Sequence, residues 1–575
     1  MVAMRKAIIL KVLLLVLVGV LLSSFFASDT WRPSHSSLVE SFNTTFWDAG
    51  IDYPPLEMNV SYSLNSTVGE VMVEEYDAFF NSHEFNGSMI KIHAVILKPP
   101  GEGLPAVLFL HGTGGSHVQL LPYGRELASR GYVVMLMDSP GCGNSSGPTS
   151  SPENTVDFSA GPYSAYYYHN VIAARRAITA LSELPYVDPD AVAVSGVSMG
   201  GVATYLVAAT DERVKAAIPV VASGYFDEIV MEGSLANFIV PTEVTLNDQA
   251  GMDLIRYFDC RAYAEQLSIP TLLLIGTHDE FFFIEAVNKT YSIIPCEKAI
   301  NLAPNTGHAM PDDRWLVSSI IWLDHYLKGS NETLPSMPVP NAEPTNFYTS
   351  IRVTVPDPEN VSVFYRDGLP GSLWVEQDLS SGDLIPMPLF PTTVSYFIGV
   401  KSNGTVVSTS PVYTVSVVPS IFVLSVAFLI AVMLVLFMNW RDEFLNTESD
   451  AMGLALFIAG IVIWAVAAFA TSLPWVDFTG RTSVNLLQLW DKYALHFAPF
   501  AILMLGLFGS MLAFAVRIWL GGLALLFTFG WVYYYLIPLT SLSASAISLG
   551  FGAYVVGVCI AISFLIPAVL KIIRG

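Results

Sequence analysis

Residues 192–201 read VAVSGVSMGG, and this stretch decides the fold. Its first residues form an apolar strand pattern, and a helical pattern begins near Met199. Between the two lies a G-x-S-x-G turn with Gly196 and Gly200 on either side of Ser198. So sharp a turn strains the serine backbone, exposes its Oγ above the sheet and leaves no room for a Cβ at the glycines. The same letters occur in plain Gly/Ser loops, but the strand before and the helix after favour Ser198 as a nucleophile.

A serine nucleophile needs a base, and the base needs a carboxylate that orients it. After a turn of this kind the acid and then the base are expected, each following a later strand. A buried-strand pattern, TLLLIG, is followed by THDE, which makes Asp279 the acid candidate. Glu280 and His278 are its alternatives, because one residue of register decides which side chain points inward. The next strand pattern, KAINL, is followed by NTGH, and its His308 is the base candidate.

An oxyanion hole must face the nucleophile and the base. Upstream, the apolar run AVLFL leads into HGTGG at residues 111–115, an HG-x-GG loop. The backbone N–H groups of Thr113 and Met199 are the candidate oxyanion donors. Because the main chain donates, a threonine in place of a glycine at residue 113 does not remove the donor.

These motifs, each at the end of a strand and in the right order, resemble those of the α/β-hydrolase superfamily over roughly Ile90 to Leu327. From His111 to the DSPG segment ending at Gly141, the chain is similar to the dienelactone hydrolase, acetyl xylan esterase and prolyl oligopeptidase-like branch. The resemblance implies esterase or peptidase activity, and the mechanism needs no metal or organic cofactor. Peptidases of the prolyl oligopeptidase type usually carry a large β-propeller. The short N-terminal region leaves no room for one, which favours an esterase or acyl hydrolase.

Other polar residues near these motifs receive non-catalytic interpretations. His111 is expected to shape the loop that it begins, and Asp138 to accept hydrogen bonds from loop amides after its strand. His117 and His169 are expected to be surface or helix residues. No zinc-type Cys/His spacing is present, so we expect no metal site.

The composition limits the class of protein. The chain has 575 residues, too many for one compact domain. It is 53% hydrophobic and only 13% charged, with the apolar excess concentrated at the two ends. Its net charge of −22 argues against a nucleic-acid partner. The cysteines, Cys142, Cys260, Cys296 and Cys559, do not indicate a disulfide framework, although a Cys260–Cys296 bridge stays open.

The N-terminus carries an export signal. Arg5 and Lys6 precede an apolar run over 7–26, so residues 1–27 are a signal peptide or an uncleaved signal anchor. Phe25 fits the small-residue rules of cleavage poorly, which favours the anchor. In either case the following domain is expected to be exported.

Glycosylation sequons support export. All N-x-[ST] sequons lie between the N-terminal run and the C-terminal apolar region, and none follows Asn403. The alternative is chance in a Ser/Thr-rich chain. The candidate attachment sites are Asn43, Asn59, Asn65, Asn86, Asn144, Asn288, Asn331, Asn360 and Asn403.

The exported part divides by pattern. Residues 28–88 are interpreted as a polar lead-in with one or two strands. The hydrolase domain follows over 89–330, and residues 89–98 alternate like an antiparallel edge strand. Hydrophobic runs then alternate with helical patterns, which predicts an α/β fold with a mostly parallel sheet and helices on both faces. Residues 222–262 lack a clear strand and are a possible cap over the site.

A change of period marks the next module. A proline-rich linker covers 331–344. Residues 345–418 then alternate with period two between Gly and Pro turns, which predicts a small Ig-like β-sandwich. This module carries no evident chemistry and is interpreted as a spacer or a lid.

The remainder, residues 419–575, is expected to be a membrane domain. Its apolar runs each approach the length that a bilayer requires. The predicted transmembrane helices cover 421–438, 451–470, 493–516, 518–537 and 547–570.

Charge at the two termini predicts the orientation. With the N-terminal anchor, an even number of spans returns Lys571 and Arg574 to the side of Arg5 and Lys6, as the positive-inside rule expects. The C-terminal spans contain no Asp or Glu, and His496 is the ionisable side chain well within one. Ion-coupled transporters usually need intramembrane carboxylates, so the bundle is interpreted as an anchor or assembly module.

The sequence therefore predicts a multi-pass cell-membrane protein with cytoplasmic termini and an extracytoplasmic serine hydrolase domain. Its substrate would be a small-molecule or peptide ester or amide, cleaved through an acyl-enzyme formed on Ser198. One alternative is a serine peptidase. An alternative of another class is a non-enzymatic membrane receptor or scaffold that retains the fold, against which the complete set of Ser198, His308 and Asp279 argues.

Overall fold

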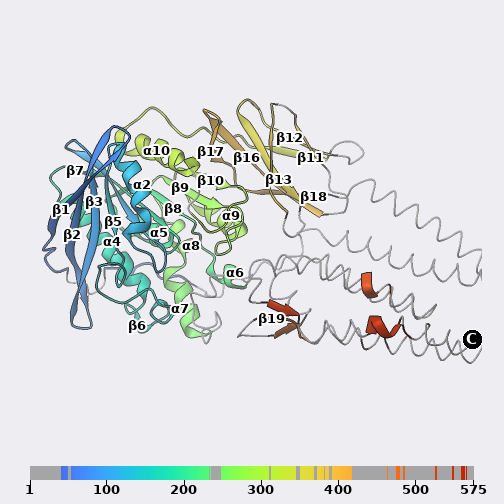
Figure 1. Ribbon diagram of the computed structural model, residues 1–575, viewed down its shortest axis with the longest axis horizontal. Coiled ribbons are helices and arrows are strands. Elements are labelled where there is room, and N and C mark those ends of the chain that lie inside the picture. The colour runs from blue at the N-terminus through green and yellow to red at the C-terminus, as the bar shows by residue number, and fades with distance from the viewer. Residues whose placement is uncertain are drawn as a thin grey trace, which may run out of the picture.

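The computed structural model describes most of the chain between residues 41 and 417 and short pieces beyond (Figure 1). The described residues are 41–48, 53–231, 234, 248–309, 313–344, 350–367, 372–380, 382–386, 392–417, 463, 466, 474–478, 483–485, 523, 525–527, 547–549, 559–563 and 565. The predicted N-terminal run and nearly all of the predicted membrane spans lie outside them. Within the described residues, no helix has the length and apolar character needed to cross a bilayer.

A parallel sheet forms the centre of the fold. Its strands follow the order β5-β4-β7-β8-β9-β10, and each neighbouring pair is parallel. They are β4 (Leu104–Leu110), β5 (Val133–Met137), β7 (Val187–Val197), β8 (Val214–Val220), β9 (Thr271–Gly276) and β10 (Lys298–Ala303). Strands β5 and β9 are buried along their whole length. Strands covered on both faces need apolar residues throughout, which is why the sequence shows them as continuous hydrophobic runs.

Helices cover this sheet (Figure 1). Both α4 and α5 pack against β7 and against each other, and α10 also packs against β7. The helices are α2 (His117–Ser129), α3 (Pro152–Thr155), α4 (Tyr166–Ser182), α5 (Met199–Thr210), α6 (Phe226–Met231), α7 (Gln249–Phe258), α8 (Cys260–Ala264), α9 (Ile284–Ile293) and α10 (Asp313–Lys328). A short strand, β6 (Ser159–Pro162), precedes α4. Helices α6, α7 and α8 lie in the region predicted as a cap, much of which is outside the described residues.

The sheet extends beyond β5 through antiparallel strands from the predicted lead-in. β1 (Asn59–Val68) pairs with β2 (Val71–Phe85), β2 pairs with β3 (Ser88–Lys98), and β3 pairs with β5. The prediction of an edge strand over residues 89–98 is therefore wrong. β3 alternates only at its start and is buried from Ile92 to Leu97, because the β1–β2 hairpin covers the side that the sequence left open.

An aromatic cluster ties the start of the described chain to the hydrolase core. Trp47 is 2% exposed, and its ring stacks on Tyr168 with the centroids 5.9 Å apart. Its Nε1–H donates to the Tyr263 hydroxyl at 3.1 Å. Residues of the predicted lead-in are thus part of the hydrolase core rather than a separate segment.

The C-terminal strands continue the same sheet at its other end. β17 pairs with β10, and the order runs on through β16 and β13 to β14, with β18 also on β16. The separate three-stranded sheet β11-β12-β15 shares a second apolar core with β13 and β16. These strands are β11 (Asn341–Pro344), β12 (Ser350–Thr354), β13 (Val361–Asp367), β14 (Val375–Asp378), β15 (Leu384–Pro386), β16 (Thr392–Ser402), β17 (Thr405–Thr409) and β18 (Tyr413–Val417). The strands of the predicted sandwich are thus present, but one of its layers is continuous with the hydrolase sheet.

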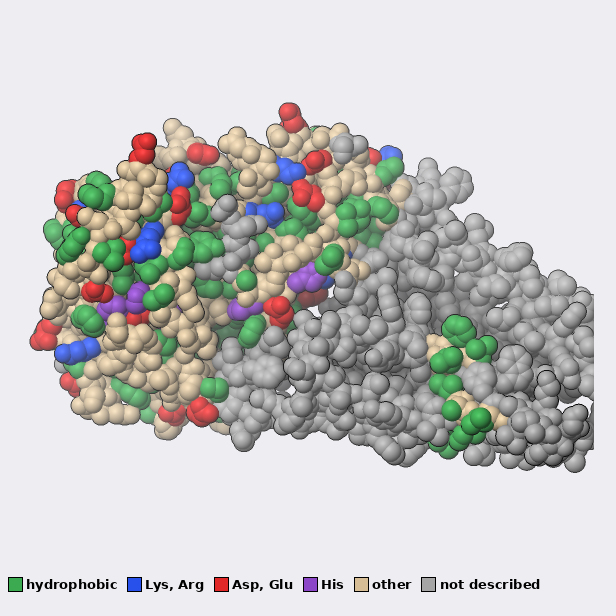
Figure 2. All heavy atoms as spheres, viewed as in Figure 1, with side chains coloured by type: hydrophobic (Ala, Val, Ile, Leu, Met, Phe, Trp, Pro, Cys, Tyr) green, Lys and Arg blue, Asp and Glu red, His purple; other side chains and the backbone are tan. Residues whose placement is uncertain are grey.

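Two further features bear on the sequence-based expectations. Cys142, Cys260, Cys296 and Cys559 are all free, so the Cys260–Cys296 bridge that the sequence left open is not present. Figure 2 shows acidic and basic side chains interspersed with apolar ones over the visible face of the described part, without a continuous basic surface.

The buried position of Trp47 gives a first prediction. Trp47→Ala should lower the free energy of unfolding by about 3–5 kcal/mol, because it leaves a cavity under Tyr168 and removes the indole N–H that donates to the Tyr263 hydroxyl. Chemical denaturation of the full-length protein measures the change. The matched control is Tyr62→Ala on β1, where the side chain is 59% exposed and the expected change is within about 0.5 kcal/mol. Equal effects of the two substitutions would contradict the placement of Trp47 in the core.

Candidate active site

The turn between β7 and α5 holds Ser198 in a strained backbone. Its φ is 58° and its ψ is −115°, values that a residue with a Cβ rarely adopts. A Cβ on Gly196 would overlap the Gly200 carbonyl group, and one on Gly200 would overlap the Leu110 carbonyl group. The predicted close approach of backbone at both glycines is confirmed. The Ser198 N–H donates to Val220 O at 2.9 Å, which ties the turn to β8.

The structure brings Ser198, His308 and Asp279 together. The Ser198 hydroxyl lies 2.8 Å from His308 Nε2 and can donate to it. On the other side of the ring, His308 Nδ1 lies 3.0 and 2.9 Å from the two Asp279 carboxylate oxygens. Asp279 is 4% exposed, and its Oδ1 accepts the N–H groups of Phe281 and Phe282. A buried carboxylate held in this way orients the imidazole with Nε2 free to take a proton from the serine.

The neighbours of Asp279 have different partners. Glu280 Oε2 accepts the main-chain N–H of His308 at 2.7 Å, so this carboxylate holds the loop rather than the ring. His278 donates its N–H to Thr306 O, and its ring lies beside the Thr277 hydroxyl. Burial lowers the pKa of His278. Of the three candidates, only Asp279 faces the imidazole of His308.

The predicted oxyanion loop lies beside the serine. A Cβ on Gly112 would stand 3.3 Å from the Ser198 Cβ, and Gly115 N–H closes the loop onto Gly112 O at 3.0 Å. Met199 is the first residue of α5, whose N–H has no partner within the helix. Within the described residues, neither the Met199 N–H nor the Thr113 N–H donates to a protein acceptor. Two candidate oxyanion donors therefore lie next to Ser198.

The His111 side chain holds the oxyanion loop through hydrogen bonds. It is fully buried, its Nδ1–H donates to Gly112 O at 2.8 Å, and its Nε2 accepts the Ser139 N–H at 2.9 Å. Burial lowers the pKa of His111, which keeps the ring neutral in this donor and acceptor arrangement. The contacts agree with the structural role inferred from the sequence.

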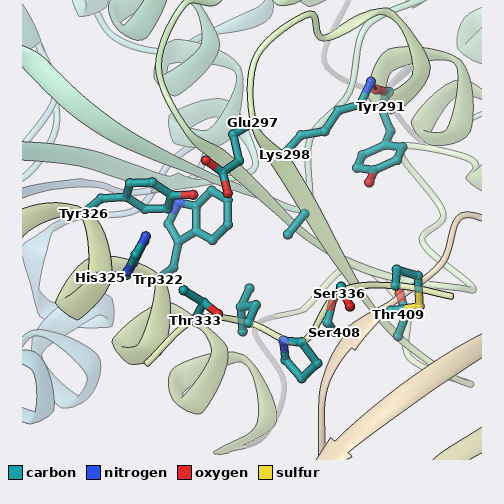
Figure 3. Close-up of a pocket in the computed structure, with 14 residues that line it drawn as sticks. Tyr291, Glu297, Lys298, Trp322, His325, Tyr326, Thr333, Ser336, Ser408 and Thr409 are labelled. Atoms are coloured by element: carbon teal, nitrogen blue, oxygen red, sulfur yellow. Dashed lines mark hydrogen bonds between the residues drawn. The ribbon is translucent and has the colours of Figure 1, made fainter. Parts of the chain in front are cut away.

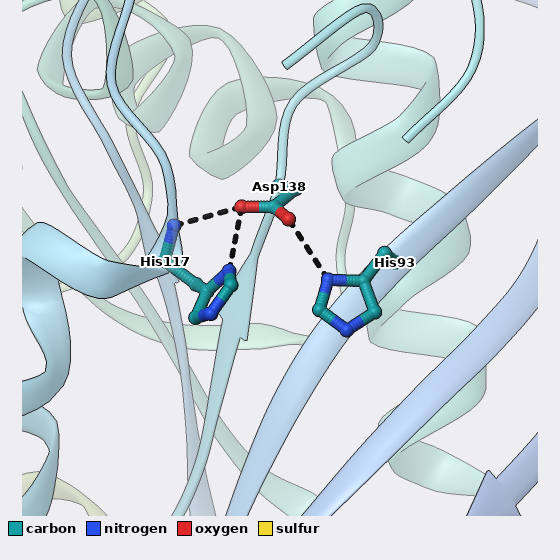
Figure 4. A group of neighbouring side chains, drawn as sticks. All are labelled: His93, His117 and Asp138. Carbon is teal, nitrogen blue, oxygen red and sulfur yellow. Dashed lines mark hydrogen bonds and ion pairs between the residues drawn. The ribbon is translucent and has the colours of Figure 1, made fainter. Parts of the chain in front are cut away.

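His93, His117 and Asp138 form a largely buried polar cluster, in which His117 lies two residues after the HGTGG loop (Figure 4). Burial opposes ionisation of Asp138, but hydrogen bonds from His117 and His93 outweigh it and hold the pKa of this carboxyl well below its usual value. Its oxygens also accept the N–H groups of His117 and Asn144. His93 places its other ring nitrogen 3.0 Å from Asp77, and the two carboxylates overcome burial and raise the pKa of His93.

The same three side chains are of the types that bind transition metals, and their ligand atoms lie within 4.8 Å of one another. Each histidine Nδ1 is, however, already within 2.9 Å of an Asp138 oxygen, and two main-chain amides occupy further lone pairs of that carboxylate. These contacts fit a hydrogen-bonded anchor for the loop better than a metal centre. The sequence placed Asp138 at loop amides but missed His93, which lies on a strand with no motif to mark it.

Two histidines occupy sites that the sequence did not anticipate. His117 begins α2, as the helix alternative predicted, but its ring is half-buried against Asp138 rather than exposed. His169 lies in α4 and is 1% exposed, stacked on His83 with the centroids 5.2 Å apart. Burial and the nearby Arg176 lower the pKa of His83 to about 4, and burial and His83 lower that of His169 to about 3. Both rings are therefore neutral members of the core.

Nearly all candidate glycosylation sites are accessible. Eight of the nine asparagines are exposed: Asn43, Asn59, Asn65, Asn86, Asn144, Asn331, Asn360 and Asn403. Asn288 on α9 is half-buried, and its side-chain amide exchanges two hydrogen bonds with the main chain of Val412. A glycan on Asn288 would break this pair of hydrogen bonds, which argues against attachment at this site.

A cavity of about 150 Å³ lies away from these residues (Figure 3). It is enclosed by α10, the segment after it and β17, with Trp322, Tyr326 and Tyr291 among its lining residues. Glu297 and Lys298 line it at the start of β10, whereas His308 follows the end of that strand. The cavity and His308 therefore lie at opposite ends of β10, and the cavity is separate from the group formed by Ser198, His308 and Asp279.

The geometry separates the roles of two adjacent carboxylates. Asp279→Asn should lower turnover by about 10⁴, because the amide favours the wrong tautomer of His308. Glu280→Gln should cost far less, since an amide oxygen can still accept the His308 N–H. Steady-state kinetics on a p-nitrophenyl ester compares the two variants. A larger loss in Glu280→Gln than in Asp279→Asn would move the acid by one residue.

Family models match two overlapping parts of the chain. Residues 92–224 match the dienelactone hydrolase family, and residues 166–367 match the model described as PhoPQ-activated pathogenicity-related protein. No curated protein matches the chain.

Solved structures with a similar chain include two esterases. The acetyl xylan esterase from Paenibacillus sp. R4 is 22% identical, with 48% of this chain and 90% of that chain covered and a TM-score of 0.42. Acetyl xylan esterase 1 from Thermoanaerobacterium sp. JW/SL YS485 is 21% identical, with 48% and 89% covered and a TM-score of 0.40. The family match, the parallel strand order and the serine turn at the end of β7 show that the chain contains an α/β-hydrolase domain.

Proposed function

We propose that this chain is a membrane-anchored serine hydrolase that cleaves an ester bond outside the cytoplasm. The observation that carries the proposal is the line of hydrogen bonds from Ser198 through His308 to Asp279. The match to the dienelactone hydrolase family supports hydrolase chemistry.

The proposed mechanism follows from the atoms at the site. Ser198 Oγ attacks the carbonyl carbon while His308 Nε2 takes its proton. The negative charge that forms on the carbonyl oxygen is stabilised by the N–H groups of Thr113 and Met199, at about 3 kcal/mol for each donor. His308 then protonates the leaving alcohol. A water molecule, activated by the same imidazole, hydrolyses the acyl-Ser198 ester.

An ester is preferred to a peptide as the substrate for a structural reason. The described residues before β3 form the β1–β2 hairpin and an aromatic cluster packed on the hydrolase core, rather than a substrate-filtering propeller. The second candidate activity is that of a serine peptidase. A receptor or scaffold that retains the fold is less well supported, because such a protein has no need for a buried acid, an oriented base and a strained serine in register.

Replacing the nucleophile tests this function. Ser198→Ala should lower hydrolysis of p-nitrophenyl acetate or butyrate by about 10⁶, because no covalent intermediate can form. Wild-type protein, but not the variant, should react with a fluorophosphonate probe. A thermal melt of the same samples controls for folding. Wild-type activity in a variant with an unchanged melt would refute the assignment of Ser198.

The proposed sidedness has sequence and structural support. The basic residues at both ends of the chain and the sequons between them favour cytoplasmic termini and an external hydrolase. β19 (Pro474–Phe478) pairs with β20 (Ser483–Asn485) and with β21 (Ile547–Leu549). Strands that share hydrogen bonds must lie on the same side of a bilayer. The chain crosses two predicted spans between β20 and β21, and an even number of crossings returns it to the same side. β21 takes the first three residues of the last predicted span, so that span would begin after Leu549.

Protease protection tests the sidedness. Protease added to intact cells or right-side-out vesicles should release a fragment that contains Ser198 and leave a tag after Gly575 protected. Detergent-permeabilised membranes provide the control, because there the tag should be digested as well. A protected hydrolase or a digested tag in sealed membranes would overturn the proposed orientation.

A further inference from the structure

The C-terminal strands β12–β18, which we call the β layer, reach the segment that carries His308. β10 leads directly into this segment, and its outer side is bonded to β17. The Thr409 hydroxyl accepts the Leu302 N–H at 3.0 Å, and the Asn301 amide donates to Val406 O at 3.2 Å. The β layer therefore holds β10, the strand that leads into the segment with His308.

A second contact lies closer to the base. The side-chain amide of Asn305 donates to Trp374 O at 2.9 Å, and its oxygen accepts the Trp374 N–H at 2.7 Å. Asn305 precedes His308 by three residues and has a left-handed backbone with a φ of 57°. Two hydrogen bonds from one planar amide fix both the position and the orientation of this turn relative to Trp374.

Trp374 is itself well anchored. It is 4% exposed, and its ring meets Phe397 edge to face with the centroids 4.9 Å apart. Phe397 stacks on Phe364 of β13, and Arg366 lies 4.9 Å above the Trp374 ring. Both phenylalanines belong to the same apolar core as the hydrolase strands. Asn305 is thus bonded to a residue that is packed into the apolar core.

We propose that the β layer positions the catalytic base His308. Asn305 is the positioning residue, because its hydrogen bonds to Trp374 fix the turn that precedes His308. The inference rests on the proposed function, and it replaces the role of spacer or lid that the sequence suggested. The Ser198–His308 hydrogen bond joins segments 110 residues apart in sequence, so its length depends on how accurately the loop before His308 is held. A displacement of about 1 Å in such a contact can cost about 10² in rate.

The chain offers a matched control for Asn305. Asn288 on α9 makes the same paired bonds to Val412 of the β layer, at 3.0 and 3.1 Å. It joins the same two parts of the molecule but precedes no catalytic residue. Removal of the Asn288 amide therefore shows how the loss of one such pair of hydrogen bonds changes the stability of the protein without a direct effect on His308.

The experiment compares Asn305→Gly with Asn288→Ala in the full-length protein in detergent. Glycine keeps the left-handed backbone of Asn305 and removes only the amide. Asn305→Gly should lower kcat for p-nitrophenyl butyrate about tenfold to a hundredfold with little change in KM, and should slow fluorophosphonate labelling of Ser198 by a similar factor. Asn288→Ala should leave kcat and the labelling rate within about twofold of wild type, although its melting temperature also falls. Asn305→Asp, which keeps one acceptor for the Trp374 N–H, should lie between wild type and Asn305→Gly and serves if the glycine variant does not fold.

The outcomes separate this inference from the proposed function. A wild-type protein that fails to label at Ser198 would overturn the proposed function. Labelling and kcat at wild-type levels in both Asn305 variants would overturn the positioning role and leave the proposed function standing. Equal losses of kcat in Asn305→Gly and Asn288→Ala would also overturn it, because the effect would then come from general loosening of the β layer.

Discussion

The fold depends on the abrupt turn that takes β7 into α5 at Ser198. The chain can reverse there only if the serine adopts a left-handed backbone and the main chain passes within contact distance of Gly196 and Gly200. The hydrogen bond from the Ser198 N–H to Val220 O ties the turn to β8. Strain at this point is sustained because the buried parallel strands on both sides leave the turn no other path.

Polar groups at the same edge of the sheet are arranged by partners that are themselves buried. Asp279 is held by two main-chain amides, and His111 supports the oxyanion loop as a neutral ring. Asp138 collects hydrogen bonds from two histidines and two amides. Such a network fixes loop geometry because each member would lose its partner if the loop moved.

The segments before and after the parallel strands are integral parts of the hydrolase domain. Trp47 fills the core beneath Tyr168, and β17 extends the hydrolase sheet beyond β10. Asn305 then links the β layer to the segment before His308. The segments on both sides of Ser198, Asp279 and His308 therefore help to hold them, which would couple the stability of these segments to the geometry of the proposed active site.

Local sequence determined the serine turn, the buried strands and the order of Ser198, Asp279 and His308, because these features depend on hydrophobic period and on neighbouring glycines. It also placed His111 as a loop support. It made Asp279 the acid candidate but did not exclude Glu280 or His278, and it could not detect the burial of His117 and His169 or show that β3 is interior and that β17 joins β10. Those outcomes were decided by tertiary structure, because pairing and burial depend on which distant segments pack together, and no local pattern records its partner across the fold.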